Sequence, residues 1–143
     1  TRINPIQADL GSYKVEPRLT LVPTSIASLD SIVITKGNMS IVKTNEYQKD
    51  ALVGKGTVVR NALNNQLTTL TGSITVLLKD NVSASEVANQ AGMKVTSIFS
   101  GTNIAVLEVL DTTDLLDAFN NLKASNLVLS SKVEVTDTIH QAL

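Results

Sequence analysis

The residues that could do acid–base or nucleophilic chemistry are few in this sequence and poorly spaced for it. The single histidine, His140, lies near the end of the 143-residue sequence. A hydrolytic triad needs a base held beside its nucleophile, and the segment around His140 has no predicted neighbours that would hold it. Asp111, Asp114 and Asp117 fall where a helix is expected to begin, so the helix dipole explains them better than catalysis does. We therefore predict that the chain is not an enzyme.

Two further patterns suggest ligand sites, and both fail on spacing or composition. The run GKGT at 54–57 is similar to the end of a phosphate-binding loop, but position 50, where the loop needs a glycine, is Asp50. A zinc site needs several nitrogen, sulfur or carboxylate ligands, and one histidine with no cysteine cannot supply the usual set. The sequence thus predicts no catalytic residue, no metal site and no cofactor.

Composition and charge limit the partners that the chain could have. Its 43% hydrophobic content is enough for a packed core. Its 12 basic and 13 acidic residues leave a net charge of −1, so no general field would draw it to nucleic acid or anionic lipid. No apolar run approaches the roughly 20 residues of a membrane span. The sequence begins with Thr1 rather than Met, which indicates a mature form that has lost a signal peptide, and we expect a secreted protein, extracellular or periplasmic.

The second half of the chain shows a regular alternation of expected elements. The run SITVLLKD at 73–80 alternates polar and apolar residues as a strand does. Ser83 and Glu86 fit a capping box that begins a helix, which Gly92 would end. Two β-type runs, MKVTSIFS and NIAVLEVL, follow and are joined by a short turn at 101–102.

A second helix and a last strand complete this order. Asp111 can cap a helix whose apolar face comprises Leu115, Leu116, Phe119 and Leu122. Residues from Asn126 onward alternate again as a strand. The order β-α-β-β-α-β over 73–136 is that of a ferredoxin-like module, an α+β fold in which both helices lie on one face of a four-stranded antiparallel sheet.

The other face of that sheet is expected to be open. A strand that faces water on one side should be polar at every second position, yet Ile104-Ala105-Val106-Leu107 is apolar on both sides. Ile104 and Val106 therefore predict a surface that a partner covers, unless the N-terminal part of the same chain covers it.

Residues 1–72 are expected to form a mixed, strand-containing extension. The residues 31–44 fit a hairpin, and 18–22 can add a strand. Apolar residues at helical spacing predict a helix over 57–70, which Gly72 would end.

Three runs of the module carry a resemblance to a known family. SITVLLKDNVSASEV is similar to that family's opening strand and first helix, KVTSIFSGTNIAVLEV to its central hairpin, and KVEVTDTIHQAL to its last strand and an extended tail over 137–143. Through these runs, residues 73–143 resemble the subtilisin propeptide-like inhibitor family. The resemblance implies the propeptide of a secreted subtilisin-like serine protease, which acts as intramolecular chaperone and tight inhibitor and keeps its protease a zymogen.

The resemblance also implies which residues touch the protease catalytic domain. Ile104 and Val106 would pack on two parallel protease helices. Asp137 would cap one of these helices, where N–H groups are unsatisfied, and Glu134 is the candidate for the second cap although it lies one residue from the family's position. The tail would lie in the substrate cleft as an added strand, with Leu143 in the primary specificity pocket. The tail residues are Ile139, His140, Gln141, Ala142 and Leu143.

Two other classes remain open. An independently encoded protease inhibitor or chaperone would use the same module without being the front of a precursor. A small-molecule-binding regulatory domain would share the βαββαβ order, because such modules bind amino acids between paired copies, but it leaves the tail without a role. A single-stranded RNA binder of this topology would need stacking aromatic residues, and Phe99 is the only aromatic residue in the two central strands.

Overall fold

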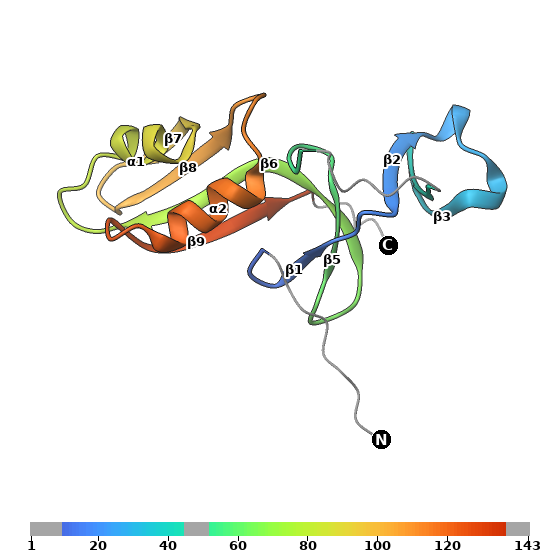
Figure 1. Cartoon of the computed structure of the whole chain (residues 1–143), viewed down its shortest axis with the longest axis horizontal. Coiled ribbons are helices and arrows are strands. Elements are labelled where there is room, and N and C mark those ends of the chain that lie inside the picture. Colours follow the sequence, from blue (N-terminus) through green and yellow to red (C-terminus); the bar gives the residue numbers. More distant parts are fainter. Residues whose placement is uncertain (1–9, 45–51, 137–143) are drawn as a thin grey trace, which may run out of the picture. The chain divides into compact units, whose positions relative to one another are not determined.

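The computed structural model describes residues 10–44 and 52–136 of the chain (Figure 1). These residues divide into two compact units, each with its own buried apolar side chains. Of the described residues, the first unit holds 10–44, 56–69 and 135–136, and the second holds 52–55 and 70–134. Strands β6 (Leu67–Leu78) and β9 (Val128–Val135) contribute residues to both units.

The second unit has the expected order of elements. Between β6 and β9 lie α1 (Ala84–Ala91), β7 (Met93–Phe99), β8 (Ile104–Val109) and α2 (Leu115–Ala124). Strand β7 pairs with β8, β8 with β6, and β6 with β9. The first two pairings are antiparallel. The third runs the same way, because the Lys79 N–H donates to the Leu127 carbonyl (3.0 Å) while the Thr71 hydroxyl donates to the Glu134 carbonyl (3.2 Å).

One face of this sheet carries the core of the second unit. Side chains alternate along a strand, so the buried residues of β6 and β8 all point to the same side. They are Ile74, Val76, Leu78, Ala105 and Leu107. The two helices pack against each other and cover this side with Val87, Ala88, Ala91, Leu115, Ala118, Phe119 and Leu122 (Figure 1). The α+β class, a mostly antiparallel sheet with two helices, is therefore confirmed.

The sheet is larger than the four strands that the sequence predicts. Strand β6 begins at Leu67 rather than at residue 73, and its first three residues pair with β5 (Val58–Asn61), which in turn pairs with β1 (Tyr13–Val15). The hydrogen-bonded order is β1-β5-β6-β8-β7, with β9 also on β6, which makes six strands. The run LTTLT before residue 73 is rich in β-branched threonine and favours strand, so the sequence carries no signal that would start the strand at Ser73.

Helix α1 matches its expected ends but not its expected cap. Gly92 ends the helix in the left-handed region, with φ of 71°. A side chain there would meet the Thr113 side chain at 2.9 Å, so space as well as backbone conformation favours glycine. Ser83 is the N-cap residue, but its side chain makes no capping hydrogen bond, and the expected capping box with Glu86 is therefore wrong.

Helix α2 begins three residues later than the sequence predicts. Asp114, not Asp111, is the N-cap, and its Oδ1 accepts hydrogen bonds from the backbone N–H groups of Leu116 (2.9 Å) and Asp117 (3.2 Å). Both aspartates suit an N-cap, but the two threonines after Asp111 are poor helix formers. From Leu115 onward the buried apolar residues recur at a helical spacing, whereas none of residues 111–114 is buried.

The first unit contains a small sheet of the order β2-β4-β3. Its strands are β2 (Leu19–Pro23), β3 (Ile32–Lys36) and β4 (Met39–Lys43), and two short 3₁₀ helices, η1 (Thr24–Ile26) and η2 (Leu29–Ser31), connect β2 to β3. The expected hairpin and the expected extra strand are both confirmed. In the central strand β4, the fully buried hydroxyl of Ser40 lies 2.9 Å from that of Thr24 and 3.1 Å from that of Thr35, so a buried polar atom is satisfied.

The helix predicted over 57–70 is wrong. Strand β5, a turn and the start of β6 occupy this stretch. The apolar residues there do fit a helical spacing, but the asparagines between them fit a turn better, and Asn65 adopts a positive φ of 64°. Gly72 lies inside β6 with φ of 91°, where a Cβ would approach the Lys55 Cβ to 3.3 Å, so it does not end a helix.

We expect Asp114→Ala to lower the free energy of unfolding by about 1–2 kcal/mol, the usual cost of losing an N-cap. The side chain also accepts the Val53 N–H through Oδ2 at 2.9 Å, while the Val53 carbonyl accepts the Leu115 N–H at 2.7 Å, so the loss should reach segment 52–55. Urea unfolding followed by circular dichroism measures the change. The matched control is Asp111→Ala, which should cost less than about 0.5 kcal/mol. Equal losses in the two variants would contradict the assignment of the cap.

Candidate docking surface

The side of the second unit's sheet that faces away from α1 and α2 carries two rows of side chains that run across three strands. The pairing registers join Thr75, Val106 and Ser97 in one row, and Leu77, Ile104 and Phe99 in the other. Residues directly opposite each other on neighbouring strands point to the same face. We call these six residues the open face.

The open face is apolar along one of its rows. Along β8, Ala105 and Leu107 are 1% and 0% exposed under the helices, whereas Ile104 and Val106 on the other side are only partly buried. Phe99, beside Ile104, is 50% exposed. The sequence prediction that Ile104 and Val106 lie away from the helices agrees with this placement, although the docking role assigned to them stays a prediction.

Phe99 and Leu77 belong to this surface and were missed by the sequence reasoning. Counted by strict alternation from buried Met93, Phe99 would point toward the helices. A register shift between Val95 and Ser97, a β-bulge, reverses the alternation, so that Ile98 pairs with Ala105 and Phe99 with Ile104. Leu77 could have been found, because it alternates with the core residues of its strand. The bulge has no clear signal in the sequence.

Charged residues mark the end of the open face away from Phe99. Lys94 and Glu108 lie opposite each other on β7 and β8 and form an ion pair of 3.3 Å. Their side chains are 59% and 42% exposed, so the pair contributes well under about 1 kcal/mol to stability. It keeps this end of the surface polar.

Of the two candidate helix-capping residues, only Glu134 lies in the described part of the chain. On β9, Val133 is buried on the helix side. Because side chains alternate, Glu134 points to the side of the open face. Its backbone carbonyl accepts the Thr71 hydroxyl hydrogen bond, which fixes this stretch of β9. Asp137 and the five tail residues Ile139, His140, Gln141, Ala142 and Leu143 lie outside the described residues.

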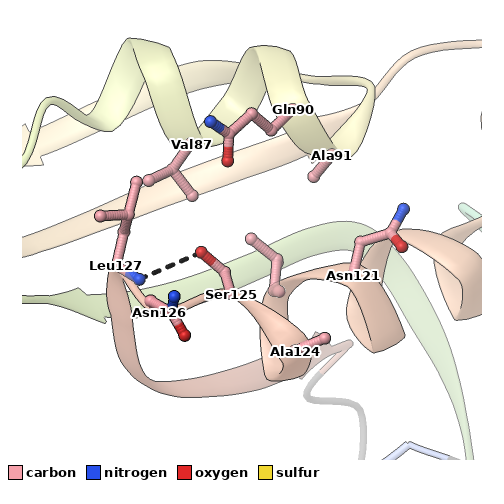
Figure 2. Close-up of a pocket in the computed structure, with 9 residues that line it drawn as sticks. Val87, Gln90, Ala91, Asn121, Ala124, Ser125, Asn126 and Leu127 are labelled. Carbon is pink, nitrogen blue, oxygen red and sulfur yellow. Dashed lines mark hydrogen bonds between the residues drawn. The ribbon is translucent and has the colours of Figure 1, made fainter.

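A groove of about 460 Å³ lies between the C-terminal ends of α1 and α2 (Figure 2). Apolar side chains and four polar ones line it; the residues are Val87, Gln90, Ala91, Asn121, Leu122, Ala124, Ser125, Asn126 and Leu127. The Ser125 hydroxyl is already used, since it accepts the Leu127 N–H at 3.2 Å. An amino acid ligand would bring an ammonium and a carboxylate, and none of these nine residues carries a charge to pair with either. The groove therefore gives no support to a regulatory amino-acid site.

The run GKGT contributes to a second, smaller groove of about 330 Å³. Gly54 and Lys55 line it together with the carboxylate residues Glu108 and Asp111. Two carboxylates beside a single lysine would repel a phosphate, which agrees with the sequence interpretation that this run is not a phosphate-binding loop.

Neither a metal cluster nor a membrane-crossing helix is found in the described part of the chain. Within residues 10–44 and 52–136, no three histidine, cysteine, aspartate or glutamate side chains gather as they would around a metal ion. No helix in the same ranges combines the length and apolar character needed to cross a membrane.

Comparison with known proteins gives a family. No curated protein matches the sequence. Among solved structures, the chain is similar to one in the crystal structure of the complex between the Aeromonas sobria serine protease (ASP) and the chaperone ORF2, with a TM-score of 0.47 and 23% identity over 60% of this chain and 83% of that one. The family model described as the open reading frame 2 N-terminal domain matches residues 2–142. The chain therefore belongs to the open reading frame 2 N-terminal domain family.

Proposed function

We propose that this chain is a chaperone and inhibitor of a subtilisin-like serine protease, which it binds through the open face and the tail 137–143. The observation that carries the proposal is the apolar row Leu77, Ile104 and Phe99 on a sheet face that no described helix covers. Full burial of an aliphatic or aromatic side chain contributes roughly 1.5–3 kcal/mol. Helices of the catalytic domain are suitable partners for this face, because a helix laid on a sheet is a standard way to bury both apolar surfaces.

Acidic residues next to the open face support helices as the docking elements. Glu134 points to the same side as the open face, and Asp137 follows three residues later in the sequence. A helix N-terminus has unsatisfied N–H groups and a partial positive charge, so a carboxylate placed there is stabilising. In the proposed complex, the two acidic residues cap protease helices while the apolar row packs on their sides.

The tail supplies inhibition in this proposal. Residues 139–143 would enter the substrate cleft as an added strand, with the main chain hydrogen-bonded to the cleft and Leu143 in the primary specificity pocket. The protease would bind the tail in the same way as it binds a substrate chain. The open face would then hold the tail at a high local concentration, which makes occupation of the cleft persistent.

Chaperone activity follows from the same complex. A subtilisin-like catalytic domain has a large parallel sheet with many non-local contacts, which slows its folding. The open face offers a preformed surface on which protease helices can assemble. A protein that binds only the folded state stabilises that state by about 4 kcal/mol at a thousandfold excess over Kd.

Family membership supports the serine protease as the partner. The family designation, open reading frame 2, is also the name of the chaperone in the complex with the Aeromonas sobria serine protease. We further propose that the four strands β7, β8, β6 and β9 with their two helices form a ferredoxin-like module. We also propose that the chain acts after secretion.

Refolding of a denatured subtilisin-like protease from the same organism tests this proposal. With the separate chain present in equimolar amount, we expect at least a tenfold higher yield of folded protease than without it. Protease activity should stay low until the chain is removed, because the same complex inhibits. An unchanged yield, with no inhibition of the native protease, would refute the proposed function.

Ile104→Asp should weaken association with the protease by more than about 100-fold, because burying an uncompensated carboxylate costs several kcal/mol. The free chain should lose much less stability, since Ile104 is only partly buried in it. Calorimetric titration and thermal unfolding measure the two effects. Ile98→Asp is the matched control, because Ile98 lies in the same hairpin, is 63% exposed and points to the opposite side. An equally large effect of both substitutions on binding would contradict the docking surface.

Replacing residues 139–143 by a glycine-serine segment of equal length should raise the inhibition constant by at least about 100-fold. In the cleft these residues gain backbone hydrogen bonds worth roughly 0.5–1.5 kcal/mol each and bury the Leu143 side chain. Thermal unfolding should not change, because the last buried strand residue is Val133. An unchanged inhibition constant would mean that inhibition, if present, comes from the open face alone.

A further inference from the structure

The turn between β5 and β6 displays one large apolar side chain to solvent. The turn covers residues 62–66, after the last residue of β5 and before the first of β6. Leu63 is 84% exposed there, although the neighbouring side chains from Asn61 to Gln66 are mostly amides. A single exposed leucine is common on protein surfaces. Leu63 differs from most exposed leucines because hydrogen bonds fix the backbone of its turn.

Hydrogen bonds fix the backbone of the turn on both sides of Leu63. The Leu63 N–H donates to the Asn61 side-chain oxygen at 2.8 Å, and the Gln66 N–H donates to that of Asn64 at 3.0 Å. Across the turn, the Asn61 N–H donates to the Gln66 carbonyl (2.8 Å) and the Asn65 N–H to the Asn61 carbonyl (2.7 Å). The position of the Leu63 Cα is therefore fixed from two directions.

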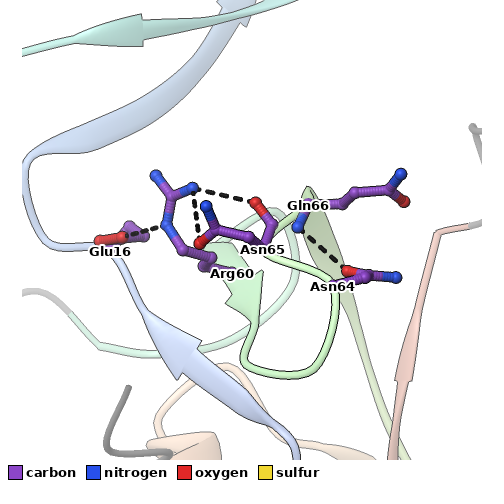
Figure 3. Close-up of polar contacts among 5 residues, drawn as sticks. All are labelled: Glu16, Arg60, Asn64, Asn65 and Gln66. Carbon is purple, nitrogen blue, oxygen red and sulfur yellow. Dashed lines mark hydrogen bonds and ion pairs between the residues drawn. The ribbon is translucent and has the colours of Figure 1, made fainter. Parts of the chain in front are cut away.

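A guanidinium group braces the same turn from β5 (Figure 3). Arg60 Nη1 donates to the Asn65 carbonyl at 3.0 Å and reaches the Asn65 side-chain oxygen at 3.4 Å. Its Nε donates to Glu16 Oε1 at 2.9 Å, and the two side chains are only 27% and 20% exposed. Because the guanidinium is planar and its donors are fixed in a fork, this arrangement holds the turn more firmly than a point charge would.

Turn chemistry explains the asparagines but not the leucine. Asn61 and Asn64 supply side-chain acceptors, and Asn65 tolerates the positive φ of 64°. At position 63 the turn uses only the backbone N–H, so any residue except proline could supply that hydrogen bond. A leucine there gains nothing from the fold and stays in water. Because the backbone on both sides of Leu63 is already fixed, its side chain would lose little ordering entropy on association.

We propose that Leu63 is an anchor that enters an apolar pocket on the serine protease partner, as a contact additional to the open face. This inference rests on the proposed function. A protein pocket is the surface that one leucine surrounded by amides fits, because binding to a lipid surface needs a broad apolar face flanked by lysines and arginines. The turn leads directly into β6, the strand that carries Thr75 and Leu77 of the open face. Leu63 lies in the first compact unit, so that unit would also take part in recognition.

Binding of the full chain to the native protease, measured by calorimetric titration, tests the anchor. Leu63→Ala should raise Kd by about 10–30-fold, because most of the apolar side chain that would fill the pocket is removed. Its thermal unfolding should match that of the unsubstituted chain, because the side chain touches water. Leu29→Ala is the control: Leu29 is 87% exposed in η2, and its substitution should change Kd less than twofold. A Kd unchanged by Leu63→Ala would overturn the anchor.

Arg60→Lys tests whether rigidity of the turn matters. Lysine keeps the charge but cannot bridge Glu16 and Asn65 in the same fork, so we expect a Kd about 3–5-fold higher. In the Leu63→Ala background, Arg60→Lys should not change Kd further, because the turn then carries no leucine side chain to be positioned. Purely additive effects would overturn the role of the brace.

The outcomes separate this inference from the proposed function. If Ile104→Asp weakens binding and Leu63→Ala does not, the proposed function stands and the anchor is wrong. If the unsubstituted chain does not bind the protease, both are wrong. If Leu63→Ala instead abolishes self-association of the chain, seen by sedimentation, the pocket belongs to a second copy and the anchor on the protease is overturned.

Discussion

The packing of both helices on one side of the sheet is the constraint on which the second unit depends. Both helices pack on the side of Ala105 and Leu107, so the alternation along β8 leaves Ile104 and Val106 on the side that no described helix covers. A sheet in this position normally exposes polar residues. Here an apolar row remains, and the β-bulge in β7 extends it by turning Phe99 to the same side. The open face therefore depends on the alternation along β8 and on the β-bulge in β7 as well as on the residue types.

The N-cap of α2 also connects the helix to segment 52–55. The Asp114 carboxylate accepts two N–H groups of its own helix and one from Val53, and the Val53 carbonyl accepts the Leu115 N–H. One side chain thus satisfies donors at the helix N-terminus and holds segment 52–55 against it. Unsatisfied helix N–H groups are costly when buried, so a single aspartate both starts the helix and fixes where an approaching chain segment lies.

The sequence could predict elements with strong local signals and not those decided by pairing. The order of strands and helices in the second half follows from alternation and from Gly92, and the apolar run at 104–107 indicates that Ile104 and Val106 lie on the side away from the helices. The helix expected over 57–70 failed because apolar spacing competes there with asparagine turn chemistry, which only the pairing of β5 with β6 decides. Asp111 and Asp114 suit an N-cap equally by type. The bulge that moves Phe99 depends on the register between β7 and β8, which a periodic pattern cannot specify.

The composition of the open face limits how far its apolar area extends. Its second row is Thr75, Val106 and Ser97, which breaks the apolar area, and the Lys94–Glu108 ion pair borders it. Contiguous apolar patches beyond a few hundred Å² cause association of otherwise monomeric proteins. The open face comprises six residues, fewer than the roughly 20–30 that each side of a standard protein interface contributes. Tight binding of a large partner would then have to come from several separate contacts joined in one chain, because linked contacts add their effects through local concentration.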